Sequence, residues 1–244
     1  MTNGKSALKN KKKSESEPHC VPDGVKNCNN NESLTKSDLI TKPDKKATVE
    51  LLVGGPYKKH GKNQPYGHVA LRVITSTKDI TYDFGRYGKV WGIGGSEGEG
   101  MLRVWTDFNR YIRGENVTGR VTTGHSFIVD EDDAKKIIKY FEYKIKDKKP
   151  NQDRGFMKQY RIDDYHALKT NCTSVSIDGA KKALPSLMQG SKKYNKGGGL
   201  SVMDKLAAKY EGWPQKVFMP ADLNNFLNSL KGETAPTQAV TYKK

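Results

Sequence analysis

Long apolar stretches are missing from this chain of 244 residues. No segment approaches the about 18 consecutive apolar residues that a membrane-spanning helix needs. The N-terminus also lacks the apolar core, roughly 7–15 residues long, of a secretory signal peptide. We therefore expect a chain that is made in the cytoplasm without a cleavable leader or a membrane span. If it acts outside the cell, it leaves by another route.

Aromatic residues are absent from residues 1–56, and the first 46 residues are rich in Lys, Asn, Ser and Asp. A segment with so little to bury cannot compensate for the entropy that is lost on folding. We expect three parts: a disordered basic N-terminal arm over residues 1–46, one folded domain over residues 47–232, and a flexible C-terminal tail over residues 233–244.

Acidic residues are scarce: 27 Asp and Glu are outnumbered by 43 Lys and Arg, which gives a formal net charge of +16. Residues 1–46 hold ten Lys and six acidic residues, so they contribute +4 and the rest of the chain carries +12. Such a charge favours an anionic partner, namely nucleic acid, an acidic membrane surface or an anionic cell-wall polymer. The Lys residues are scattered and do not cluster with stacking aromatics, so we expect no specific nucleic-acid site.

Cysteine is also scarce, with three in the chain. Cys20 and Cys28 lie in the polar arm beside His19, and two cysteines and one histidine at this spacing do not make a zinc site. We expect these two thiols to form a surface disulfide or to stay free, and we expect no metal ion or cofactor in the chain. The third cysteine, Cys172, lies far from the arm.

Hydrophobic periodicity indicates an α+β domain with antiparallel strands. Alternation predicts a strand over 47–55, a hairpin over 66–88, and further strands over 101–112 and 116–129. Helical spacing predicts helices over 131–145 with Asp130 as N-cap, after Cys172, over 201–210 and over 220–230. The glycine-rich stretches 92–100 and 190–199 predict flexible loops.

Cys172 begins one of these predicted helices. Thr170 and Asn171 are residue types that cap helix N-termini, which places the thiol in the first turn. Unpaired backbone N–H groups and the helix dipole stabilise a thiolate there, and they lower the pKa of the thiol below its free value of about 8.5. The alternative is a small buried core residue. A nucleophile would also need a base and a group that orients that base.

His68 and Asp83 are the candidates for these two roles. His68 lies in "YGHVALRV", on the strand face opposite the apolar side chains of that strand. The register that joins apolar positions face to face pairs Val73 with Ile80, Leu71 with Tyr82 and Val69 with Phe84. In this register Asp83 becomes the diagonal neighbour of His68, where a carboxylate can orient an imidazole. The alternatives are a half-exposed strand histidine and a carboxylate that pairs with Arg72 or Arg86.

Three motifs in order, "YGHVALRV", "YDFGRYG" and "YHALKTNCTSVSIDGA", resemble the circularly permuted papain-like cysteine hydrolases. This group contains the permuted NlpC-type cell-wall peptidases and the lecithin:retinol acyltransferase relatives. Over residues 50–190, the resemblance implies a permuted papain-like domain in which an antiparallel sheet packs against the nucleophile helix and further helices. It implies Cys172 as nucleophile, His68 as base and Asp83 as orienting residue.

The match departs from the family pattern in two places. The family's orienting residue is often His and not Asp, and no oxyanion side chain aligns clearly. Gln64, Tyr66 and Asn171 are the nearby candidates for oxyanion or substrate binding.

The basic, leaderless chain is similar to antibacterial effectors of type VI secretion that cut peptidoglycan. This similarity implies an amidase or endopeptidase that is secreted into the periplasm of a target cell and cleaves peptide stems. The implied partners are peptidoglycan, an immunity protein and a secretion-apparatus carrier, and we expect a monomer. Two alternatives remain open: an acyl-lipid hydrolase or acyltransferase that uses the same Cys/His pair, and a basic nucleic-acid-binding module with an inert cysteine.

Overall fold

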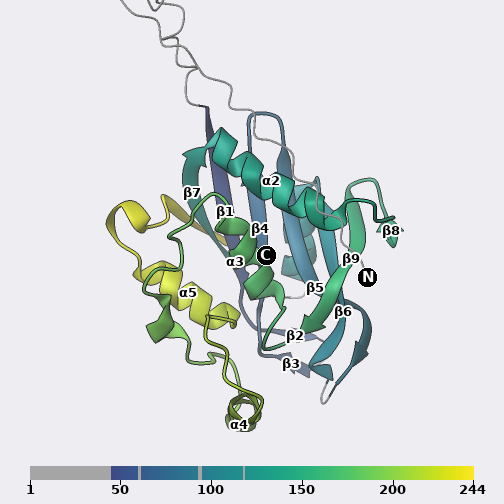
Figure 1. Ribbon diagram of the computed structural model, residues 1–244, viewed down its shortest axis with the longest axis vertical. Coiled ribbons are helices and arrows are strands. Elements are labelled where there is room, and N and C mark those ends of the chain that lie inside the picture. Colours follow the sequence, from purple (N-terminus) through teal and green to yellow (C-terminus); the bar gives the residue numbers. More distant parts are fainter. Residues whose placement is uncertain (1–44, 60–61, 93–94, 118) are drawn as a thin grey trace, which may run out of the picture. The chain divides into compact units, whose positions relative to one another are not determined.

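The computed structural model describes residues 45–59, 62–92, 95–117 and 119–244 (Figure 1). The predicted arm, with His19, Cys20 and Cys28, lies outside the described residues except for its last two positions. The strands are β1 Lys46–Gly54, β2 Tyr57–Lys59, β3 Lys62–Gln64, β4 His68–Ile74, β5 Asp79–Trp91, β6 Glu97–Trp105, β7 Thr122–Asp130, β8 Gln152–Asp153, β9 Met157–His166 and β10 Gln238–Tyr242. The α-helices are α1 Phe108–Val117, α2 Glu131–Ile145, α3 Cys172–Ala180, α4 Val202–Tyr210 and α5 Pro220–Ser229.

The described residues form a mixed α+β structure around one large antiparallel sheet. Its strand order is β10-β7-β1-β4-β5-β6-β9-β8, and β2 and β3 form a separate small hairpin. The β4–β5 register places Leu71 opposite Tyr82 and Val73 opposite Ile80, as the alternation predicts. No helix within these residues is long and apolar enough to cross a membrane.

Alternating side chains divide the sheet into two faces. The main core joins one face of β1, β4 and β5 to residues of α2, α3 and α5, and Figure 1 shows α2 and α3 lying across this face. A smaller cluster on the other face packs Leu52 and Ala70 against Tyr111 and Ile112 of α1. His68 has the parity of Ala70, so its side chain belongs to the α1 face.

Helix α3 is fixed at its start by a capping box. The Asn171 side chain accepts a hydrogen bond from the Ser174 N–H, and the Ser174 hydroxyl accepts one from the Asn171 N–H. A Cβ atom on Gly179 would lie 2.7 Å from Phe141 and 2.9 Å from Leu71, so glycine allows α3 to approach the sheet closely. The nucleophile candidate is thus held at the end of a helix that rests on β4 and β5.

One predicted strand is partly a helix. Residues 101–105 belong to β6, but residues 108–112 begin α1. The Asp107 carboxylate accepts a hydrogen bond from the Arg110 N–H and so caps this helix. Phe108, Tyr111 and Ile112 have helical spacing, and they pack on the sheet face that carries His68. The strand prediction was wrong here because the aromatic and β-branched residues outweighed the helical signal.

Four further segments differ from the predictions. The predicted flexible tail contains β10, which pairs with β7 at the sheet edge, so that prediction is wrong for residues 238–242. Strand β9, which pairs with β6, was not predicted. The glycine-rich stretch 92–100 was predicted as a loop, but its residues from Glu97 onward belong to β6. The second glycine-rich stretch, 190–199, is tied down, because the backbone N–H groups of residues 196–198 donate hydrogen bonds to the Asp222 carboxylate.

Candidate active site

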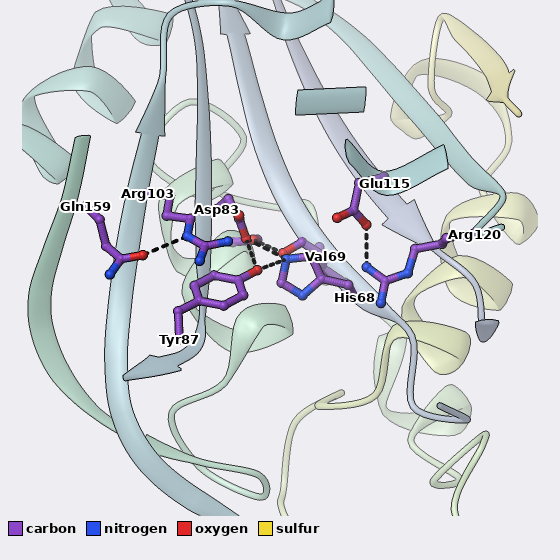
Figure 2. Close-up of polar contacts among 9 residues, drawn as sticks. His68, Val69, Asp83, Tyr87, Arg103, Glu115, Arg120 and Gln159 are labelled. Atoms are coloured by element: carbon purple, nitrogen blue, oxygen red, sulfur yellow. Dashed lines mark hydrogen bonds and ion pairs between the residues drawn. The ribbon is translucent and has the colours of Figure 1, made fainter. Parts of the chain in front are cut away.

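His68 is the first residue of β4, directly after Gly67, whose φ is +71°. Its Nε2 lies 2.6 Å from Oδ1 of Asp83 on β5 (Figure 2). Both side chains are buried, with 8% of His68 and 2% of Asp83 exposed. The predicted contact between the two residues is therefore present, and it fixes the orientation of the imidazole.

Burial and charge act in opposite directions on this pair. Burial raises the pKa of Asp83, whereas the charge and the hydrogen bond of His68 lower it. The effect of His68 is the larger one, so the pKa of Asp83 lies below its usual value. Burial lowers the pKa of His68, whereas the negative charges of Asp83 and Cys172 raise it, and the result is about 10. At neutral pH this balance favours an imidazolium beside a carboxylate.

Cys172 is the first residue of α3 and is 6% exposed. Burial raises the pKa of its thiol, but the charge of His68, a hydrogen bond with His68 and the backbone of Val69 outweigh burial and lower it. Because Asp83 engages Nε2 of His68, Nδ1 is the ring nitrogen left for the thiol. The electrostatics favour a thiolate and imidazolium pair, in which the sulfur is nucleophilic.

No family model, curated protein or solved structure gives a significant match to this chain.

Tyr87 and Arg103 extend the site, and the sequence analysis missed both. The Tyr87 hydroxyl donates a hydrogen bond of 2.8 Å to Asp83 Oδ1 and lies 3.3 Å from His68 Nε2. The Arg103 guanidinium lies 3.5 Å from the centre of the Tyr87 ring, and Gln159 accepts its Nε–H at 2.8 Å. Arg103 is directly opposite Asp83 in the β5–β6 register. The sequence did contain a signal for Tyr87: Asp83 and Tyr87 are four positions apart on β5, so strand alternation places their side chains on the same face.

The three candidates for substrate or oxyanion binding lie in different settings. Asn171 is 3% exposed, and its Nδ2 donates to the carbonyls of Ala167 and Phe218 at 2.6 and 3.1 Å, so its side chain is engaged in structure. Tyr66 is 47% exposed, and its hydroxyl donates to Asp204 of α4 at 3.2 Å. Gln64 lies in β3, where the structure describes its backbone only.

A hollow of about 880 Å³ lies along the side of α3 that carries Ser174 and Asp178. Cys172, His68 and Asp83 are not among its lining residues. Among the residues that the structure describes, no group of three or more His, Cys, Asp or Glu side chains is placed to hold a metal ion. The candidate residues themselves lie where β4, β5 and the start of α3 meet, with His68 on β4, Asp83 on β5 and Cys172 at the start of α3.

Proposed function

We propose that this chain is a cysteine hydrolase of the permuted papain-like type that cleaves amide bonds in the peptide stems of peptidoglycan. One observation carries the proposal: a buried imidazole lies 2.6 Å from a buried carboxylate, and its charge lowers the pKa of a thiol at a helix N-terminus. A nucleophile, a base and an orienting group in this order are the parts that acyl transfer through a thioester requires. The order of parts along the chain, with the base before the nucleophile, supports the permuted arrangement.

The reaction begins with the Cys172 thiolate, which attacks the amide carbonyl carbon. The tetrahedral intermediate collapses as His68 gives its proton to the leaving amine, and a thioester remains on Cys172. Water then gives a proton to His68 and attacks the thioester carbonyl. The carboxylic acid product leaves, and the proton on His68 restores the ion pair.

The start of α3 provides the means to stabilise the oxyanion. The first N–H groups of a helix have no partner within the helix and point toward negative charge. Asn171 takes the N–H of Ser174. The N–H groups of Cys172 and Thr173 are the backbone donors closest in sequence to the attacking sulfur, and we assign the oxyanion to them.

The net charge of +16 supports peptidoglycan and its anionic surroundings as the place of action. In this proposal the chain is an antibacterial effector that acts in the periplasm of a target cell. A carrier of the secretion apparatus exports it, and an immunity protein protects the producing cell.

Digestion of purified muropeptides, followed by mass spectrometry, tests the proposed function. The full chain should split a stem peptide into two products whose summed mass exceeds that of the substrate by one water. The Cys172→Ala variant should leave the substrate intact. Muropeptides that stay intact with the wild-type chain over hours at neutral pH would reject peptidoglycan as substrate.

An acyl lipid is a second candidate substrate, favoured by the surface of α4. This helix exposes a cluster of apolar side chains: Val202, Met203, Leu206 and Tyr210, which are 76%, 73%, 55% and 95% exposed. Asp204 of the same helix binds Tyr66, two residues before His68. Thin-layer analysis of lipid digests separates the two candidates. For a lipid substrate, Met203→Glu with Leu206→Glu should abolish lipid turnover, whereas muropeptide turnover should not change.

A further inference from the structure

Arg120 lies beside His68, on the side away from Asp83. Gly54 of β1 is paired directly with His68 of β4, so a side chain on Gly54 would lie on the same sheet face as the imidazole. That space is filled by Arg120, because a Cβ atom on Gly54 would lie 2.5 Å from Arg120 Cδ. Strand β5, with Asp83, lies on the other side of β4. Figure 2 shows the same arrangement, with Asp83 and Arg120 on opposite sides of His68.

The Arg120 guanidinium is held firmly but is incompletely bonded. The residue is 9% exposed; its Nη1 donates to Glu115 of α1, and the guanidinium lies 4.4 Å from the centre of the Tyr57 ring. Its buried Nε–H has no acceptor among the residues that the structure describes. A buried donor without an acceptor is unfavourable, and a ligand that supplies the acceptor removes this penalty.

Tyr111 feels the charges of both Arg120 and the candidate nucleophile Cys172. It lies on α1, one turn before Glu115. The geometric link to the thiol runs through His68, because Arg120 fills the space beside His68 at Gly54 and the charge of His68 acts on the Cys172 thiol. A group of the substrate that reaches Arg120 would lie next to the carbonyl that Cys172 attacks.

We infer that Arg120 binds a carboxylate of the substrate, next to the amide bond that Cys172 cleaves. The inference rests on the proposed function. A planar carboxylate matches the fork of guanidinium N–H donors. Glu115 already neutralises part of the guanidinium charge, which suits a singly charged carboxylate better than a doubly charged phosphate. The preferred substrate is thus a peptide with a free carboxylate at the residue that flanks the scissile bond, and its carboxamide analogue is a poor substrate.

The first test does not depend on hydrolysis. Iodoacetate and iodoacetamide both alkylate a thiolate, but only iodoacetate carries a carboxylate. The double variant Arg120→Gln with Glu115→Gln replaces the ion pair by two neutral amides, so neither charge of this pair is left without the other. We expect the ratio of the Cys172 alkylation rates, iodoacetate over iodoacetamide, to fall about tenfold in this variant. The control Arg110→Gln removes an exposed charge from α1 and should leave the ratio near the wild-type value.

The second test compares muropeptides with a free carboxylate and with a carboxamide at the flanking position. The wild-type chain should prefer the carboxylate in kcat/KM by about 10- to 100-fold, and the double variant should lose this preference. Thermal melting and circular dichroism confirm that each variant folds, and Arg120→Lys, which keeps the charge, should retain part of the preference.

The outcomes separate the two proposals. An unchanged alkylation ratio in a folded double variant overturns the role of Arg120, and so does a carboxylate preference that survives in that variant. If neither muropeptide is cleaved while the alkylation ratio falls as expected, the peptidoglycan substrate fails and the carboxylate site remains.

Discussion

Asp83 Oδ1 lies 2.6 Å from His68 Nε2, and neither residue is exposed by more than a tenth. Charges buried in this way are costly unless they are paired, so each residue depends on the other for its ionised form. Because Asp83 engages Nε2 of His68, Nδ1 is the ring nitrogen left for the proposed reaction at Cys172. The site is therefore arranged as one unit of three residues.

The first prediction is that Cys172 and His68 act as one catalytic unit, so that the loss of either residue abolishes turnover. Cys172→Ala or His68→Ala alone should abolish measurable turnover, and the double variant should be no worse than either single variant. The reason is that removal of one member already disables the other. Steady-state rates on the cleaved muropeptide measure this. Losses that multiply in the double variant would mean that the two residues do not share a mechanism.

The second prediction concerns Asp83→Asn. The Asp83 charge raises the pKa of His68, and the His68 charge lowers the pKa of Cys172. Loss of the carboxylate therefore destabilises the imidazolium and raises the pKa of the thiol. The pH midpoint of iodoacetamide alkylation should lie well below the free-thiol value of about 8.5 in the wild-type chain and should move upward in Asp83→Asn and in His68→Ala.

Turnover of Asp83→Asn should fall roughly 100-fold. This is less than the roughly 10⁴-fold loss of a serine-protease orienting residue, because a thiol ionises more readily than a hydroxyl. If His68→Ala moves the alkylation midpoint and Asp83→Asn does not, the orienting group of His68 is not Asp83.

The contact between His68 and Asp83 could be predicted because strand parity is local information. Apolar residues at every second position of β4 and β5 determine which face enters the main core, so the register follows from burying them. The structure has two of the three expected pairs, Leu71 with Tyr82 and Val73 with Ile80, and the paired part of the two strands does not extend to Val69 and Phe84. Once these are set, His68 and Asp83 must share the opposite face. The start of α3 was equally local, since Asn171 caps it.

The residues that complete the site depend on contacts between distant segments. Arg120 reaches His68 because Gly54 leaves space on a strand about 65 positions earlier, and no short sequence pattern encodes that. The stacking of Arg103 on Tyr87 requires the β5–β6 register, which contains a bulge between Arg86 and Val90. Strand β10, with the sequence QAVTY, has no buried residue of its own, so no core-facing alternation marks it as a strand.

The third prediction concerns the attachment of β10. The Tyr242 hydroxyl donates to the buried Glu50 carboxylate at 2.9 Å, and its ring packs against Phe108 of α1. Tyr242→Ala removes both contacts and should lower the free energy of unfolding by about 2 kcal/mol. For a domain of this size the melting temperature should fall by about 4–8 °C. Deletion of residues 1–40 is the comparison, because that segment has almost nothing to bury and should leave the melting temperature nearly unchanged.

The last prediction concerns Tyr87, whose hydroxyl donates to the same Asp83 oxygen that His68 contacts. This hydrogen bond helps to lower the pKa of Asp83. Tyr87→Phe keeps the ring under Arg103 and removes the donor, so the pKa of Asp83 should rise. Protonation of Asp83 removes the support of the imidazolium and in turn that of the thiolate. The acid limb of the kcat profile and the alkylation midpoint should therefore both move to higher pH, with turnover lower by about tenfold at neutral pH.

Tyr140→Phe is the matched control for Tyr87→Phe, because it removes a tyrosine hydroxyl from α2, which lies on the other face of the sheet. This control should leave the acid limb and the alkylation midpoint at their wild-type positions. If Tyr87→Phe lowers only the melting temperature and leaves both pH values unchanged, the Tyr87 hydroxyl contributes to stability alone. A positioning role for the hydroxyl requires that the acid limb and the alkylation midpoint both shift without a matching loss of stability. Packing cannot cause such a shift, because Tyr87→Phe keeps the ring.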